Sequence, residues 1–167
     1  NSAMTAAWIK SQTDREVLFT IATRDMNKLA LQSLLLGAQL HGLENIVVVK
    51  GDPPRQRDRG RLISVDDYTP TSLIGAVREL NNGTDLRGLD LRTPTNFCIG
   101  ATIDLARDLN TELTLTRQKI DAGAQFFLAQ PNFNPHGLLK FFECYRIRFR
   151  EALAAPVFNG LQVMTSE

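Results

Sequence analysis

The chain has 167 residues, of which 43% are hydrophobic and 22% are charged, a composition that fits one soluble globular domain with a sizeable core. With 19 basic and 18 acidic residues the formal net charge is only +1, which argues against nucleic acid or an anionic membrane surface as a partner. The apolar runs are far shorter than the roughly 20 residues of a membrane helix, and Cys98 and Cys144 lack a metal-binding spacing, so we expect packed, reduced thiols in a cytoplasmic protein.

Short runs rich in β-branched and aromatic residues alternate along the chain with longer segments of helical period. The first predicted elements are a helix at Ser2–Gln12, a strand at Glu16–Thr23, a helix at Lys28–His41, a strand at Ile46–Val49 and a helix at Ser72–Leu80. Asn27 is expected to cap the second helix, and Gly42 to end it. The segment from Gly51 to Pro70 is too long for an ordinary connection, which favours a functional loop.

The second half of the chain continues the same alternation. Its predicted elements are a strand at Phe97–Ala101, a helix at Thr111–Ala122, a strand at Gln125–Ala129, a helix at His136–Leu153 and a strand at Pro156–Leu161. This order predicts an α/β fold with about five parallel strands in a single domain that spans residues 1–167. The periodicity leaves two architectures open, an open doubly wound sheet or part of a (β/α)8 barrel, since a complete barrel takes about 250 residues.

Polar side chains directly follow four of the predicted strands, where ligands collect in either architecture. They are Arg24 and Asp25, then Lys50, Gly51 and Asp52, then Thr102 and Asp104, and finally Gln130. A strand that reaches the surface explains a polar residue at any single position, but four in succession favour a polar site. In the Gly-Asp-Pro-Pro stretch, the glycine permits close approach of the backbone to a ligand and the prolines stiffen the exit.

Several stretches resemble successive signatures of the methylenetetrahydrofolate reductase family. They are RDMNKLALQSLLLGAQLHGLENI, VVVKGDPP, FCIGA, RQKIDAGAQFFLAQ and PVFNGL. The chain is most similar to the reductase half of bifunctional homocysteine methyltransferase/methylenetetrahydrofolate reductase proteins, and the resemblance covers nearly all of it. The resemblance implies a partial (β/α)8 TIM barrel with outer helices, with N-terminal and C-terminal strands missing and a homo-oligomer or a partner chain to complete it.

The resemblance also implies an activity. The family reduces 5,10-methylenetetrahydrofolate, a small-molecule folate, to 5-methyltetrahydrofolate by hydride transfer through bound FAD, with a nicotinamide nucleotide or another reductant as electron donor. Asp52 matches the aspartate that lies beside the flavin ring and acts in catalysis, and Lys50 and Gly51 line the same edge. Glu112 matches the acidic residue at the FAD ribose, and Lys119 the lysine at its phosphates. Without the resemblance, this Glu and Lys would be read as an ordinary pair on a solvated helix face.

Gln130 matches the glutamine that hydrogen-bonds the pterin, and an amide suits a ring edge that presents donors and acceptors. Thr20 and Ala101 match positions that face the flavin. The family often has His at the position of Thr20 and Thr at that of Ala129, and its general-acid glutamate, on the first barrel strand, has no counterpart here. These departures keep a second interpretation open, a non-catalytic folate- or flavin-binding homologue or a subunit completed by a partner chain.

The remaining charged and imidazole groups have structural interpretations. The arginine group of Arg55, Arg57, Arg59 and Arg61 is expected to be a solvated loop, with contact to an anionic nicotinamide cofactor or a folate glutamyl tail as the alternative. His41 and His136 are assigned to helix ends. No spacing typical of a metal site or a Ser-His-Asp arrangement is present.

Overall fold

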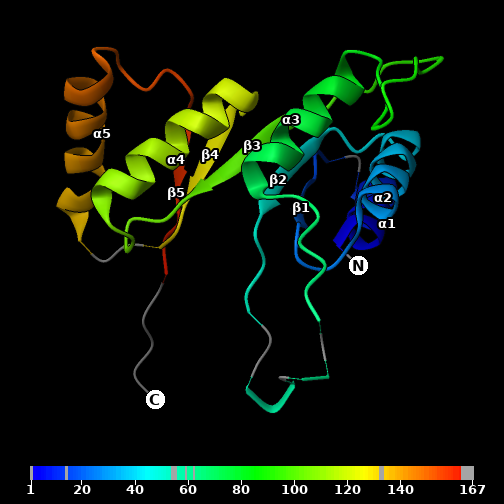
Figure 1. The fold of residues 1–167 in the computed structure, drawn as a ribbon, viewed down its shortest axis with the longest axis horizontal. Coiled ribbons are helices and arrows are strands. Elements are labelled where there is room, and N and C mark those ends of the chain that lie inside the picture. Colours follow the sequence, from blue (N-terminus) through cyan, green and yellow to red (C-terminus); the bar gives the residue numbers. More distant parts are fainter. Residues whose placement is uncertain are drawn as a thin grey trace.

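The computed structural model describes residues 2–13, 15–53, 56–58, 60–61, 63–131 and 134–162. These residues form one sheet in which five parallel strands lie in the order β1-β2-β3-β4-β5 (Figure 1). The strands are β1 (Leu18–Ala22), β2 (Asn45–Val49), β3 (Cys98–Ile103), β4 (Phe126–Ala129) and β5 (Val157–Asn159). The helices are α1 (Ser2–Thr13), α2 (Lys28–Leu40), α3 (Pro70–Asn81), α4 (Leu109–Ala122) and α5 (Pro135–Phe149), with a 3-10 turn η1 (Gln56–Asp58).

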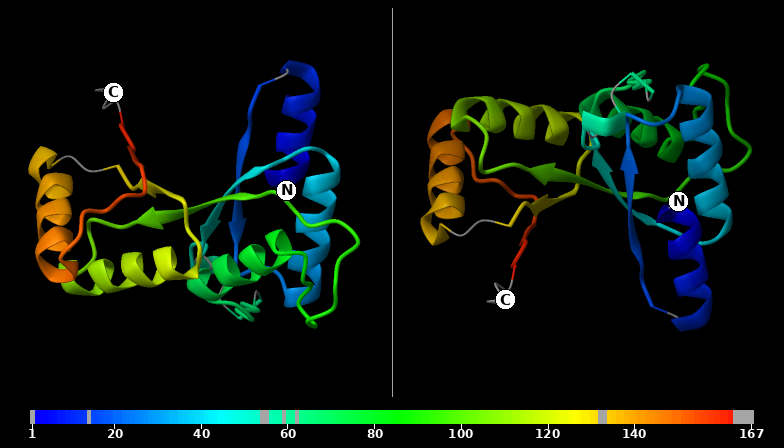
Figure 2. Two further views of the ribbon diagram at one scale, coloured as in Figure 1. Left: turned by 90° about the horizontal axis from the view of Figure 1, so that it is seen from above. Right: turned by 90° about the horizontal axis from the view of Figure 1, so that it is seen from below.

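The sheet is singly wound and curved. Each strand pairs with the next strand along the chain, whereas a doubly wound sheet reverses its strand order at a switch point. Viewed from above and from below, the helices lie along the convex side of the curved sheet, and no helix of the described chain covers its concave side (Figure 2). The prediction of parallel strands with outer helices is therefore confirmed, and the architecture is that of a partial (β/α) barrel.

In the edge strand β1 the two faces differ in burial, because only one of them meets the helices. In β1, Phe19 and Ile21 are 3% and 1% exposed, while Leu18 and Thr20 on the opposite face are exposed. The parallel register continues the helix-facing row through the core residues Val48, Ala101 and Phe127. It also places Thr20, Val47, Gly100 and Phe126 in one row on the concave face.

Local capping explains where the helices begin. The Asn27 side chain accepts a hydrogen bond from the Ala30 N–H, as predicted, and Gly42 follows α2 with a φ of 67°. Helix α3 begins with a capping box in which Thr69 and Ser72 bond each other's main-chain N–H. These caps set the residues at which α2 and α3 begin.

The predicted elements all occur, with shifts at their ends. The helix predicted to reach Leu153 ends at Phe149, because Arg150 adopts a left-handed conformation with a φ of 57°. The turn η1 was not predicted. Of the arginine group in the long loop, Arg55 and Arg59 lie outside the described residues. Among the helices of the described chain, none is long and apolar enough to cross a membrane.

Candidate functional site

A pocket of about 790 Å³ opens between α3 and α4 at the C-terminal ends of β2 and β3. This volume lies in the range of small-molecule sites, roughly 300–1,000 Å³. Its lining residues are Lys50, Thr69, Pro70, Thr71, Ser72, Thr102, Arg107, Thr111, Leu115, Gln118 and Lys119. The pocket therefore lies at the edge of the sheet where the sequence predicts a polar site, and three cationic side chains line it.

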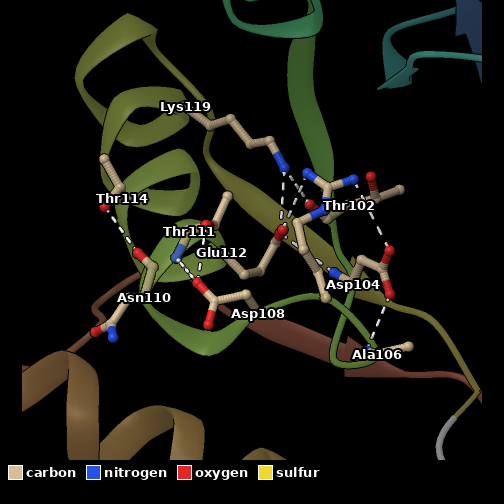
Figure 3. Close-up of polar contacts among 10 residues, drawn as sticks. Thr102, Asp104, Ala106, Asp108, Asn110, Thr111, Glu112, Thr114 and Lys119 are labelled. Carbon is tan, nitrogen blue, oxygen red and sulfur yellow. Dashed lines mark hydrogen bonds and ion pairs between the residues drawn. The ribbon is translucent and has the colours of Figure 1, made fainter.

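Helix α4 turns two charged side chains inward at the wall of this pocket (Figure 3). Glu112 and Lys119 are 2% and 7% exposed, and Lys119 Nζ lies 3.5 Å from Glu112 Oε1. Lys119 Nζ also donates a hydrogen bond of 2.6 Å to the main-chain oxygen of Thr102, and the Asp104 N–H donates one of 3.2 Å to Glu112 Oε1. These contacts tie α4 to the end of β3, so the pair is positioned by the fold and does not lie on a solvated helix face.

The charges around the pair are unevenly satisfied. Burial lowers the pKa of the Lys119 ammonium, and the Glu112 carboxylate opposes that shift. Arg107 approaches Glu112 Oε2 at 3.4 Å and Asp104 Oδ2 at 3.8 Å, yet Glu112 Oε2 accepts no hydrogen bond from the described residues. Because Arg107 approaches Glu112 Oε2 without forming a hydrogen bond, this buried oxygen keeps lone pairs that could accept a hydrogen bond from a ligand hydroxyl.

The glycine-aspartate turn lies directly after β2. Gly51 has a φ of 86°, and a Cβ at this position would lie 3.2 Å from the Ala22 Cβ and 3.3 Å from the Arg24 Cβ. The chain can make this turn without strain only with glycine. Asp52 follows with an exposed side chain, and Lys50 lies at the rim of the pocket.

The other residues assigned from the sequence lie apart from the pocket. Gln130 follows β4, where its N–H bonds the Ile103 oxygen at 3.0 Å and its side chain is exposed. Thr20 lies on the concave face of β1. Ala101 is 0% exposed and its side chain packs in the helix-facing core, which leaves its main chain as the part nearest the concave face.

The structure thus places Lys50 and Lys119 in the lining of one pocket, with Glu112 buried next to Lys119, and spreads Asp52 and Gln130 along the same edge of the sheet. Sequence reasoning missed Arg107 and the start of α3. A basic residue just before the cap of α4 could have indicated a partner for Glu112, but the approach of α3 depends on the path of the long loop. Among the described residues there is no cluster of three or more His, Cys, Asp or Glu side chains that could hold a metal ion.

Known proteins resemble this chain over most of its length. Residues 1–166 match the family described as methylenetetrahydrofolate reductase. The chain is also similar to a protein named methylenetetrahydrofolate reductase 2 from Schizosaccharomyces pombe, with 25% identity over 155 residues. That alignment covers 85% of this chain and 22% of the relative, so the chain spans less than a quarter of the relative's length.

Proposed function

The chain belongs to the methylenetetrahydrofolate reductase family, and we propose from this premise that it supplies part of the barrel of a flavin-dependent reductase. The proposed reaction reduces 5,10-methylenetetrahydrofolate to 5-methyltetrahydrofolate, with a nicotinamide nucleotide or another reductant as the electron donor. FAD, when bound, would carry the hydride between reductant and folate. The observation that carries the proposal is the buried Glu112–Lys119 pair at the wall of the pocket.

The residues of the pocket fit the sugar-diphosphate part of such a cofactor. Lys119, Lys50 and Arg107 supply positive charge for phosphate oxygens. Glu112 Oε2, which is buried beside the lining residue Arg107 and accepts no hydrogen bond from the described part of the chain, would supply an acceptor for a ribose hydroxyl that enters between them. Lys119 has three N–H donors, and among the described residues Thr102 and Glu112 engage two of them, which leaves the third for an anion.

The residues along the rest of the edge fit the flavin ring and the folate. In the proposed arrangement Asp52 lies beside the ring, where its negative charge disfavours the build-up of negative charge during reduction. Gln130 recognises the pterin through its amide, and Thr20, on the concave face, contacts the flavin. The free thiols of Cys98 and Cys144 fit the cytoplasmic location that the sequence predicts.

Separate binding titrations of the full-length protein test the two halves of this site. Lys119→Met should lower FAD affinity by about 1.5–3 kcal/mol, because it removes a charged hydrogen-bond donor. Gln130→Ala should leave FAD binding unchanged and weaken folate binding by about 1–3 kcal/mol, since it leaves ring donors and acceptors unpaired. FAD is followed by its visible absorbance, and folate by the perturbation of the bound flavin.

Lys10→Met is the matched control for the loss of a lysine. Lys10 also pairs with a glutamate, Glu16 Oε1 at 3.2 Å, but it lies on α1 far along the chain from the pocket. A wild-type protein that takes up no FAD, or a Lys119→Met variant that matches the Lys10→Met control, would remove the flavin assignment.

The substitutions at Thr20 and Ala129 favour a second candidate, a non-catalytic homologue that binds folate or flavin. The two candidates share the binding site and differ in turnover. Reduction of 5,10-methylenetetrahydrofolate by the flavin-loaded full-length protein supports the enzyme, and binding of both ligands without reduction supports the homologue.

A further inference from the structure

The long loop between β2 and α3 is anchored at both of its ends to the turn between β1 and α2. At the start of the loop, the Arg24 N–H donates to the Lys50 main-chain oxygen at 3.2 Å, and Thr23 Oγ1 donates to the same oxygen at 3.4 Å. At its far end, the Val65 N–H donates to the Arg24 main-chain oxygen at 2.8 Å. One residue, Arg24, therefore contacts the loop where it leaves the sheet and where it returns.

The N–H of Lys28 strengthens the far anchor. It donates to Asp67 Oδ2 at 3.2 Å, and the Lys28 ammonium lies 5.0 Å from the centre of the Tyr68 ring. The return of the loop is thus held against the start of α2 as well as against Arg24.

The Arg24 side chain adds a contact to Asp52 itself. Its Nε and Nη2 donate to the two carboxylate oxygens of Asp25 at 2.5 and 2.9 Å, a two-pronged contact that fixes the plane of the guanidinium. Its remaining Nη1 donates to the main-chain oxygen of Asp52. The tight turn at Gly51 brings the backbone within reach, since a Cβ there would already touch the Arg24 Cβ.

We propose that Arg24 is a positioning residue: oriented by Asp25, its guanidinium holds the main chain of Asp52 and so sets where the Asp52 carboxylate lies at the candidate site. This inference rests on the proposed role of Asp52 beside the flavin. Only arginine suits the position, because lysine has no planar fork with which to hold a carboxylate and a carbonyl in fixed directions at once. The ordinary alternative is an arginine that merely satisfies a surface carbonyl.

The test compares Arg24→Gln and Arg24→Lys with Arg78→Gln in the full-length protein. Arg78 is a matched control, because it also lies beside an acidic neighbour, Glu79, and also donates to a main-chain oxygen, that of Asp121 at 2.9 Å. The first readout, amide hydrogen exchange at Val65 and at residue 24, needs no flavin. Loss of the contacts that the Arg24 guanidinium makes with Asp25 and Asp52 should speed exchange at these two amides about tenfold in both Arg24 variants. Exchange should stay unchanged in Arg78→Gln.

The second readout is the midpoint potential of the bound flavin, combined with kcat. Arg24→Gln should shift the potential in the same direction as Asp52→Asn, and the double variant should shift it no further than Asp52→Asn alone, because both changes act through one carboxylate. The KM for the folate should change little while kcat falls about tenfold.

Two results would overturn the inference: equal amide exchange in Arg24→Gln and wild type, or shifts in potential that add in full in the double variant. A wild-type protein that binds no flavin would instead refute the proposed function, and the exchange measurement would still decide whether Arg24 holds the turn. Recovery of both readouts in Arg24→Lys would show that charge alone suffices, and would overturn the geometric argument.

Discussion

Lys119 has to be charged to attract an anion, and its surroundings both oppose and support that charge. Burial and the neighbouring Arg107 lower the pKa of the ammonium, while Glu112 and Asp104 raise it, and burial is the largest influence. A phosphate in the pocket would add one more negative neighbour and favour the protonated form. Binding of the anion and protonation of Lys119 are therefore coupled.

For the proposed binding of FAD, this coupling predicts a pH dependence of known sign. Because the pKa of Lys119 in the free protein lies below the ordinary 10.5, affinity should be greatest below that lowered pKa and fall as the pH rises through it. Lys119→Met lacks the titrating group, so the difference between the two pH profiles isolates the contribution of the lysine. Parallel profiles for wild type and Lys119→Met between pH 7 and about 10.5 would contradict the coupling.

At the scale of single residues, the sequence could predict the position of a side chain where the order of the strands alone determines that position. Lys50, Asp52 and Gln130 follow strands, so their place at the carboxyl edge could be predicted, although their roles stay predictions. The link from Arg24 to Asp52 could not, because it depends on the tight turn at Gly51 and on the direction that Asp25 gives the guanidinium. The burial of Glu112 and Lys119 also required the structure, since the spacing of the pair alone is typical of a solvated face.

At the scale of elements, β3 and β4 pack closely because Gly100 has no side chain. Gly100 lies on the concave face opposite Phe126, and a Cβ on Gly100 would lie 2.3 Å from the Phe126 Cζ. A glycine inside a strand usually weakens it. Here it makes room for an aromatic ring against the sheet.

Gly100→Ala should therefore lower the free energy of unfolding by about 1–3 kcal/mol, the usual cost of overpacking a core. Gly75→Ala is the matched control, because no atom lies within 4 Å of a Cβ at that position in α3. It should raise stability by about 0.5–1 kcal/mol, since alanine favours the helix. Denaturant unfolding of the two full-length variants provides the comparison, and a Gly100→Ala protein as stable as wild type would mean that the ring can move aside at no cost.

The helices and strands could be predicted because their hydrophobic patterns are strong. The end of an element could not be predicted where it depends on the backbone conformation of one residue. All five strands follow from runs of β-branched or aromatic residues, and the starts of α2 and α3 lie close to their capping residues. The end of α5 depends on a left-handed arginine, Arg150, which no sequence rule marks as a stop. The turn η1 lies in a loop without hydrophobic periodicity, so nothing in the sequence indicated it.

At the scale of the whole molecule, the concave face of the arc exposes apolar side chains at its two ends. Leu18 on β1 is 41% exposed and Phe158 on β5 is 59% exposed, at the two ends of the sheet. Phe126 covers part of this face and meets Phe158 edge to face, with 6.0 Å between the ring centres. We propose that further strands, from the same polypeptide or from a partner chain, complete the barrel and cover both ends.

If so, residues 1–167 expressed alone should self-associate and bind a hydrophobic dye, because their end strands expose unpaired N–H and C=O groups beside apolar side chains. The full-length protein should do neither to the same extent. Size-exclusion chromatography and dye fluorescence measure both properties, and Phe158→Ser in the short chain should reduce the dye signal. A monomeric, dye-silent short chain would show that the arc needs no completion.

The strand order also bears on how the chain acquires its fold. Every strand of the sheet pairs with the strand made just before it, so no pairing in the arc waits for a distant part of the polypeptide. The loops that must close are each one βα unit long, which keeps the entropic cost of each step small. On a ribosome, the sheet can therefore form in the direction of synthesis, because the strand that each new strand of the arc pairs with has already been made. The widest gap between successive strands lies between β2 and β3, where the long loop and α3 intervene, and this is the step at which growth should be slowest.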